Sequence, residues 1–191
     1  VVLSDVIYGG THRIATRVMT RFGVEFSFVD TSNINTVRTA LRNNTRLIFT
    51  ETPANPTLKL TDLAAVSELA RERGIPHAVD NTFLTPYYQR PLELGADIIV
   101  HSTTKYFDGH NATVGGAVIC ATEEQIESIR FVRNCLGSIM SPQVAFLTAQ
   151  GCKTLSLRMD AQSAYAQAVA EFLETHPMVD QVCYPGLASF P

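Results

Sequence analysis

Short apolar runs alternate along the chain with stretches whose apolar residues recur every three or four positions. The short runs predict strands and the periodic stretches predict helices. We expect strands at residues 1–7, 24–29, 46–50, 76–80, 98–100 and 114–120. Helices are expected at 11–21, from about 33, from about 62, at 123–135, from 142 and at 153–174. Because strands alternate with helices as far as about Cys120, the pattern predicts an α/β fold: a mostly parallel sheet with helices on both faces.

The end of the chain predicts a second unit. The long helix at 153–174 ends before Pro177, and residues 179–184 have the apolar pattern of a new strand. We therefore expect a large domain over 1–177, lacking its N-terminal part because the first residue is Val1 and not methionine, and the start of a truncated, smaller C-terminal domain over 178–191. The apolar positions of the long helix include Leu157, Ala161, Ala164, Ala168 and Phe172.

Composition narrows the possible functions. Hydrophobic residues make up 46% of the 191 positions and charged residues 17%, which is enough to bury a sizeable core. The net charge of −3 argues against nucleic-acid binding. No apolar run approaches the roughly 20 residues of a membrane helix, and no signal peptide is evident. The spacing of the four cysteines suits neither a zinc site nor a disulfide framework, so we expect a reducing, cytoplasmic setting.

Candidate chemistry gathers between residues 97 and 116. The apolar run at 98–100 leads into His101, Ser102, Thr103, Thr104 and Lys105. Hydroxyl groups can donate hydrogen bonds to a phosphate, and a partly buried lysine can form a Schiff base with an aldehyde. Pyridoxal 5′-phosphate carries both groups on one ring. An ordinary polar surface loop is the alternative for this segment taken alone.

Further polar residues follow other predicted strands. Asp80 ends one of them, and a pyridinium nitrogen needs such a carboxylate to stay protonated. Tyr8 and Asn55 follow two more. Because the loops after parallel strands meet at one edge of a sheet, these residues could share a site with Lys105. Taken singly, Tyr8 could pack at a helix start, Asn55 could hold a turn and Asp80 could cap one.

Several motifs together resemble the Cys/Met-metabolism pyridoxal-phosphate enzymes. This trans-sulfuration group includes cystathionine γ-synthase, cystathionine γ-lyase and methionine γ-lyase. The matching segments follow the family's order through almost the whole chain: Tyr-Gly-Gly-Thr at 8–11, Glu-Thr-Pro-Ala-Asn-Pro at 51–56, Asp-Asn-Thr-Phe at 80–83, Leu-Gly-Ala-Asp at 94–97, the segment 101–106 with Gly109 and His110, and Tyr-Pro-Gly-Leu at 184–187. The resemblance implies an aspartate-aminotransferase-like large domain.

The resemblance also implies roles in binding pyridoxal 5′-phosphate. Lys105 is implied to be the Schiff-base lysine and later a proton carrier. Asp80 would pair with the ring nitrogen, while Ser102 and Thr104 would bind the phosphate. Tyr8 is implied to stack on the ring and to assist proton transfer or departure of the leaving group.

The remaining implied roles concern the substrate. Asn55 would approach the ring hydroxyl or the substrate carboxylate. Arg13 would help to hold the substrate, although it could equally be a solvated helix residue. Gly10 replaces the cysteine that methionine γ-lyases often have, which favours an enzyme acting on cystathionine or homoserine esters. His101 and His110 lack companion ligands for a metal, so no metal site is expected. His77 is expected to serve packing.

The implied reaction is β/γ-elimination or γ-replacement on cystathionine, homoserine esters, methionine or cysteine, most similar to cystathionine γ-synthase or γ-lyase. Methionine γ-lyase, a homoserine-ester sulfhydrylase and an aminotransferase remain alternatives within the fold. An inactive fragment acting as an interaction domain is an alternative of another class. The family implies a homotetramer, a dimer of dimers with shared active sites. Family members are about twice as long, and their phosphate turn, partner-subunit groups and carboxylate clamp have no counterpart here. We therefore expect these 191 residues to be inactive alone.

Overall fold

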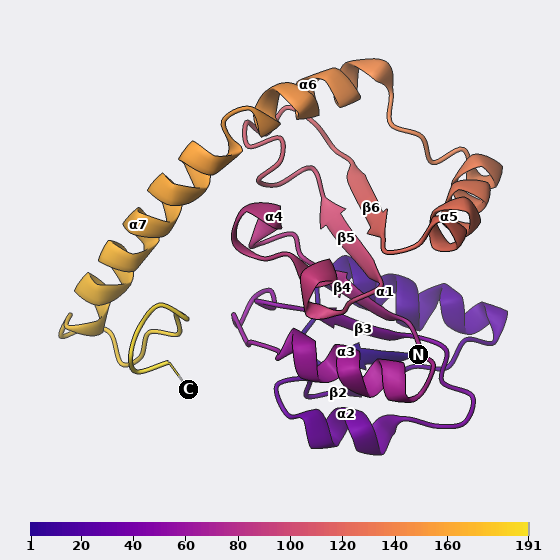
Figure 1. Cartoon of the computed structure of the whole chain (residues 1–191). Helices are drawn as coiled ribbons and strands as arrows, with labels where there is room; N and C mark the ends of the chain where they lie inside the picture. The colour runs from indigo at the N-terminus through magenta and orange to yellow at the C-terminus, as the bar shows by residue number, and fades with distance from the viewer. Residues whose placement is uncertain (191) are drawn as a thin grey trace.

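A six-stranded sheet forms the centre of the protein. The computed structural model describes residues 1–190. The strand order is β2-β1-β3-β4-β5-β6, in which β1 to β5 are parallel and β6 runs antiparallel at the edge (Figure 1). The strands are β1 Val2–Ser4, β2 Ser27–Val29, β3 Ile48–Glu51, β4 His77–Asp80, β5 Ile98–Ser102 and β6 Gly116–Cys120. The mostly parallel sheet agrees with the sequence prediction, and each strand lies within or close to its expected range.

Helices lie on both faces of this sheet and extend beyond it. They are α1 Gly9–Arg17, η1 Met19–Phe22, α2 Ile34–Ala40, α3 Leu63–Glu72, α4 Thr85–Tyr88, η2 Pro91–Leu94, α5 Glu123–Leu136, α6 Pro142–Cys152 and α7 Leu155–Glu174. The expected helix at 11–21 is divided: α1 ends at Arg17, and a 3₁₀ turn continues to Phe22. Gly23 then adopts a φ of 77°, which a glycine accommodates without strain.

The alternation of side chains along β1 contributes to two of the three hydrophobic clusters of the described chain. Val2 and Ile48 face α2 and α3, where they pack with Val37, Val66 and Leu69. The next residue along β1 points to the opposite face, so Leu3 packs with Ala15 of α1 and with Phe28 and Phe49. Because every β1 side chain meets a packed layer, the strand is fixed in position, and with it the loop that follows.

Side-chain caps begin several helices where the sequence suggested. Asn33 accepts a hydrogen bond from the backbone of Asn35 at the start of α2, and Asp62 accepts one from Ala65 at the start of α3. Thr122 and Gln125 form a reciprocal capping box at α5. Ser141 caps α6 and is followed by Pro142 at the first helical position.

The expected strand at 179–184 is wrong. Residues 179–184 form no helix or strand, and just beyond them the Gly186 carbonyl accepts a hydrogen bond of 3.1 Å from Gln167 Nε2 of α7. A strand requires a neighbouring strand to satisfy its backbone, and no strand of the described chain lies beside this segment. The proposed second unit over 178–191 is therefore irregular as far as residue 190, and Pro191 lies outside the described residues.

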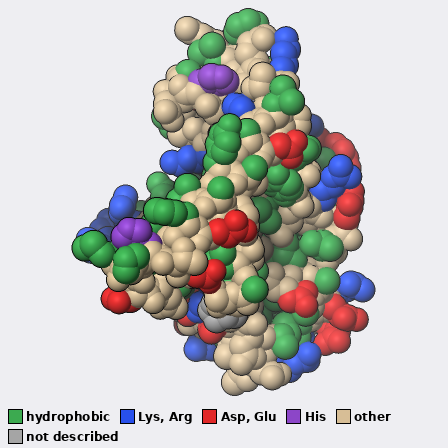
Figure 2. All heavy atoms as spheres, turned by 90° about the vertical axis from the view of Figure 1, so that its left-hand side faces the viewer, with side chains coloured by type: hydrophobic (Ala, Val, Ile, Leu, Met, Phe, Trp, Pro, Cys, Tyr) green, Lys and Arg blue, Asp and Glu red, His purple; other side chains and the backbone are tan. Residues whose placement is uncertain are grey.

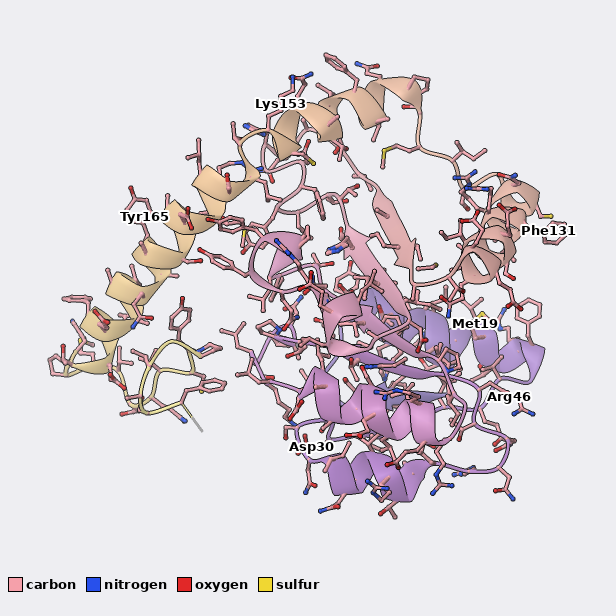
Figure 3. All side chains as sticks on the ribbon, in the orientation of Figure 1. Met19, Asp30, Arg46, Phe131, Lys153 and Tyr165 are labelled. Carbon is pink, nitrogen blue, oxygen red and sulfur yellow. The ribbon has the colours of Figure 1, made fainter. Side chains whose placement is uncertain are left out.

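We call α5, α6 and α7 the C-terminal arm, and it carries many exposed apolar side chains. In Figure 1, α6 and α7 form an arch that extends away from the sheet. Helix α7 buries Leu155, Met159 and Ala170, whereas Leu157 and Phe172 are exposed. Figure 2 views the molecule from the side of α7 and shows hydrophobic side chains on this surface. In Figure 3, Phe131 and Tyr165 point away from the sheet. None of the described helices is both long enough and apolar enough to cross a membrane.

Candidate cofactor site

A cavity of about 220 Å³ lies at the carboxyl ends of the strands. It contains every residue that the sequence analysis proposed for cofactor binding. Its lining comprises Tyr8, Glu51, Pro53, Asn55, Asp80, Thr82, Phe83, Ser102, Thr104, Lys105 and Val114. These residues come from the loops and strand ends of β1, β3, β4 and β5 and from the segment before β6.

The position of the cavity follows from the strand order. From β1, the chain goes first to β2 on one side and then to β3 on the other. The loops that follow β1 and β3 therefore diverge toward opposite faces and leave a crevice between them, which is where open α/β sheets bind their ligands. Tyr8 lies in the first of these loops and Asn55 in the second, so both reach the crevice directly.

Asp80 is the last residue of β4 and is half-buried. Its Oδ1 accepts hydrogen bonds from the backbone nitrogen and the hydroxyl of Thr82, at 3.0 and 2.6 Å. The same hydroxyl accepts a bond of 2.9 Å from the Ser102 nitrogen, which connects the ends of β4 and β5. The other oxygen, Oδ2, accepts no hydrogen bond from the described residues. The carboxylate is thus fixed in orientation and keeps one oxygen for a cationic N–H group.

The segment from Ser102 to Lys105 turns sharply out of β5. Thr104 Oγ1 accepts from the Gly115 nitrogen at 3.0 Å and lies 3.3 Å from its carbonyl oxygen, to which it can donate. A side chain at Gly115 would lie 2.8 Å from the Thr103 hydroxyl, so this close approach requires glycine. The Lys105 carbonyl accepts from the Gly109 nitrogen at 2.8 Å. These bonds fix the backbone on both sides of Lys105.

Lys105 itself presents an accessible amine. Its side chain is exposed in this structure. Within residues 1–190, its Nζ makes neither an ion pair nor a hydrogen bond, and it lines the cavity opposite carboxylate and hydroxyl groups. A free primary amine beside a cavity can react with an aldehyde that enters it.

Tyr8 and Asn55 contribute an aromatic ring and an amide. Tyr8 precedes α1 as its N-cap residue, and its ring is about half exposed. The ring lies against Gly10, where an added Cβ would be 2.4 Å from Tyr8 Cε1. A residue with a side chain at position 10 would therefore displace the ring. Asn55 is half-buried in the loop after β3, which is closed by a backbone bond of 2.7 Å from Leu58 to Ala54.

The sequence analysis missed Glu51, although it lines the cavity. It ends β3 and pairs in register with Asp80 at the end of β4. The reasoning that selected Asp80, a carboxylate at the end of a buried parallel strand, applies equally to Glu51 and would have found it.

Arg13 is not brought into the cavity. It is exposed on α1 and is not part of the lining. Its proposed contact with a substrate therefore remains a prediction that no contact in this structure supports.

Two buried histidines serve the interior of the sheet. His77 bonds through its two ring nitrogens to the hydroxyls of Thr50 and Ser67, each at 2.9 Å, and burial lowers its pKa to about 4. The expectation that His77 serves packing is confirmed. His101 packs edge-on against Phe107, and burial lowers its pKa as well. Among residues 1–190, no cluster of three His, Cys, Asp or Glu side chains could hold a metal ion.

The groups around the cavity match those of pyridoxal phosphate in kind. An amine from Lys105 suits the aldehyde, and the carboxylate of Asp80 suits a protonated ring nitrogen. Ser102 and Thr104 provide hydroxyls for a phosphate, and the Tyr8 ring provides an apolar face. The residues present therefore fit the cofactor, although Lys105 is the only cationic side chain in the lining.

Comparison with known proteins gives one consistent result. The model of the family described as Cys/Met metabolism PLP-dependent enzyme matches residues 1–191. Cystathionine gamma-lyase of Bacillus subtilis (strain 168) is 49% identical over 191 residues, which is all of this chain and 50% of that protein. A probable cystathionine gamma-synthase of Herpetosiphon aurantiacus is also 49% identical over 191 residues, again all of this chain and 60% of that protein.

The structure has equally similar neighbours. The crystal structure of cystathionine gamma-lyase from Lactobacillus plantarum complexed with L-serine superposes with a TM-score of 0.98 at 40% sequence identity. The match covers 100% of this chain and 50% of that chain. This chain thus spans about half the length of these two cystathionine gamma-lyases.

Proposed function

This chain belongs to the Cys/Met metabolism PLP-dependent enzymes, and from that premise we propose that it forms the cofactor-binding part of a trans-sulfuration enzyme. The family depends on pyridoxal phosphate and acts in the metabolism of sulfur amino acids. The proposed reaction is β/γ-elimination or γ-replacement, most similar to that of cystathionine γ-synthase or γ-lyase. The main support is the convergence of Lys105, Asp80, Ser102 and Thr104 on one cavity.

When bound, pyridoxal phosphate supplies an aldehyde and a protonated ring that withdraws electrons from the substrate carbon. Lys105 would hold the cofactor through Nζ, and its amine would be the group that moves protons at the substrate carbons. The backbone bonds on both sides of Lys105 support this role, because they keep the side chain directed at the cavity. Tyr8 covers the ring with its aromatic face and shares the proton transfers.

The remaining residues bind and orient. Asp80 would hold the ring nitrogen with its free oxygen Oδ2 and would thereby favour the protonated form of the ring. Ser102 would donate a hydrogen bond to the phosphate, and Thr104 would donate one in place of its 3.3 Å bond to the Gly115 carbonyl. Asn55 would approach the ring hydroxyl or the substrate carboxylate. Arg13, which lies on α1 outside the lining, is proposed to help hold the substrate.

We propose cystathionine or a homoserine ester as the substrate. Two relatives at 49% identity carry the names cystathionine gamma-lyase and probable cystathionine gamma-synthase, which supports this class. Gly10 supports it too, because methionine γ-lyases often have cysteine at this position, and here an added Cβ would lie 2.4 Å from Cε1 of Tyr8. Methionine γ-lyase and homoserine-ester sulfhydrylase are the alternatives, which product analysis with each substrate would distinguish.

The arrangement of the whole protein is also proposed. We assign residues 1–177 to the large domain and 178–191 to the start of a smaller one. The exposed apolar residues of the C-terminal arm support a homo-oligomer, a dimer of dimers with shared sites, in which these side chains are covered. The four cysteines of the chain are free, which supports a reducing, cytoplasmic location. We further propose that these 191 residues do not turn over substrate alone; an interaction domain without activity is the alternative.

Borohydride trapping tests the proposal. The protein is incubated with pyridoxal phosphate, reduced, digested and mapped by mass spectrometry. The adduct should lie on Lys105 and should disappear in Lys105→Ala. Lys59→Ala and Lys153→Ala are matched controls that should keep it. An adduct on Lys59 or Lys153 in the unchanged protein would contradict the assignment.

A further inference from the structure

Glu51 is a buried carboxylate without an assigned role. It is the last residue of β3, only 6% of its surface is exposed, and it lines the same cavity as Lys105. Its neighbour across the β3–β4 ladder is Asp80, a second carboxylate. Two negative groups at adjacent strand ends repel each other, so their placement at one cavity requires compensating contacts.

Both oxygens of Glu51 accept short hydrogen bonds from the backbone. Oε2 accepts from the Tyr8 nitrogen at 2.7 Å, and Oε1 accepts from the Asn55 nitrogen at 2.7 Å. The two donors lie in different loops, one after β1 and the other after β3. Hydrogen bonds of this length to a charged acceptor are about twice as strong as neutral ones. One side chain thus ties together the two loops that flank the crevice.

The electrostatics make this tie cooperative. Burial raises the pKa of Glu51, the charge of Asp80 raises it further, and the bonds from Asn55 and Tyr8 lower it. If either loop moved away, the carboxylate would stay buried but would lose one of the two backbone hydrogen bonds that stabilise its charge. An unsatisfied buried charge is unfavourable, so the contact with one loop favours the contact with the other. Tyr8 particularly needs such a contact, because no side chain caps the start of α1.

We propose that Glu51 is a positioning residue that holds Tyr8 and Asn55 in place around pyridoxal phosphate. The inference rests on the proposed function, which assigns ring contacts to Tyr8 and Asn55. Glu51 acts through the backbone of each residue: it fixes the start of α1 so that the Tyr8 ring covers the cavity, and it fixes the loop at 52–57 so that the Asn55 amide faces inward.

Cofactor affinity provides the first test. Glu51→Gln keeps the shape of the side chain but loses the charge, and its amide nitrogen opposes one of the two N–H donors. Pyridoxal phosphate titrated into the whole protein and followed by absorbance should bind about tenfold more weakly. Glu51→Asp keeps the charge with a shorter reach and should bind with intermediate affinity. Glu72→Gln, the same change on the exposed surface of α3, is the matched control and should leave the affinity unchanged.

A double-mutant cycle separates positioning from a general loss of structure. Tyr8→Ala removes the ring but keeps the backbone nitrogen that bonds Glu51. If Glu51 acts through the Tyr8 ring, then Glu51→Gln should weaken binding less in the Tyr8→Ala protein than in the unchanged protein. Equal weakening in both backgrounds, or an unchanged affinity in Glu51→Gln, would overturn the proposal. If Glu51→Gln fails to fold by circular dichroism, the same cycle with Glu51→Asp decides.

Failure of this inference is distinguishable from failure of the proposed function. If the unchanged protein gives no borohydride adduct at Lys105, the proposed function is wrong. If the adduct forms at Lys105 and the cycle is additive, only the role of Glu51 is wrong.

Discussion

At the carboxyl ends of the strands, which we call the sheet edge, polar side chains are buried and hydrogen-bonded. The C-terminal arm instead leaves large apolar side chains exposed. At the edge, Glu51 and Thr82 each accept hydrogen bonds that connect neighbouring strands or loops. On the arm, Phe131, Leu157 and Phe172 are 69%, 70% and 64% exposed. The first region departs from the usual distribution by burying charge, and the second by exposing hydrophobic surface.

The difference shows which contacts the chain makes within itself. The cavity is assembled from strands that are neighbours in one sheet, so its residues are positioned by contacts within these 191 positions. The arm has apolar side chains of the size that interfaces bury, and here they meet few partners. Predictions about stability and cofactor binding should therefore differ sharply between the two regions.

The largest effect is expected from truncating the core beneath the cavity. Ile48 is completely buried between β1 and the helices α2 and α3. Ile48→Ala should lower the free energy of unfolding by about 2–5 kcal/mol, because the lost methyl groups leave a cavity. Urea unfolding followed by circular dichroism measures the change. A loss below about 1 kcal/mol would mean that the sheet core is looser than its packing indicates.

The local patterns of the sequence predicted the sheet edge well. Asp80 and Lys105 each follow an apolar run directly, so the strand and its terminal polar residue can be seen in one short window. The strand order then brings such residues together without further information from the sequence. Glu51 satisfied the same rule and could have been included.

The sequence could not predict features that depend on distant partners. The apolar pattern at 179–184 suggested a strand, but a strand forms only where another strand can pair with it. Periodicity showed that α7 is helical, but it did not show that Leu155 and Met159 face the protein while Leu157 and Phe172 face outward. The exposure of Arg13 likewise depends on which face of α1 lies against the sheet.

The charge state of His77 in β4 should change the free energy of unfolding with pH by an amount similar to the effect of Ile48→Ala. Its pKa falls from 6.5 to about 4 on folding, because burial disfavours the charged ring. Between these values the unfolded chain binds a proton that the folded protein does not, so stability is retained above pH 6.5 and decreases as the pH falls toward 4. The loss should approach about 3 kcal/mol. The pH dependence of urea unfolding should become shallower in His77→Gln and stay the same in His12→Gln; an equal slope in all three proteins would contradict this origin.

A smaller effect is expected for one charge at the sheet edge. Asp80→Asn removes the negative charge that we propose as the partner of the ring nitrogen, and it should weaken pyridoxal phosphate binding by about 10- to 100-fold, the value of a hydrogen bond to a charged group. Asp160→Asn makes the same change on the C-terminal arm and should leave the affinity unchanged. Absorbance titration of the two variants measures the contrast directly. If both lose affinity equally, the arm contributes to the site and the distinction between the two regions fails.

The smallest effect is expected on the C-terminal arm itself. Leu157→Ala removes as many carbon atoms as Ile48→Ala, but at 70% exposure the side chain buries little surface. In a dilute sample that sedimentation shows to be monomeric, the free energy of unfolding should change by less than about 0.5 kcal/mol. A loss comparable with that of Ile48→Ala in this monomer would mean that the Leu157 side chain packs against the rest of the chain. If the cost instead appears only as the protein concentration rises, the Leu157 surface is covered by a second copy, because only association makes stability depend on concentration. That result would assign the arm to assembly and the sheet edge to chemistry.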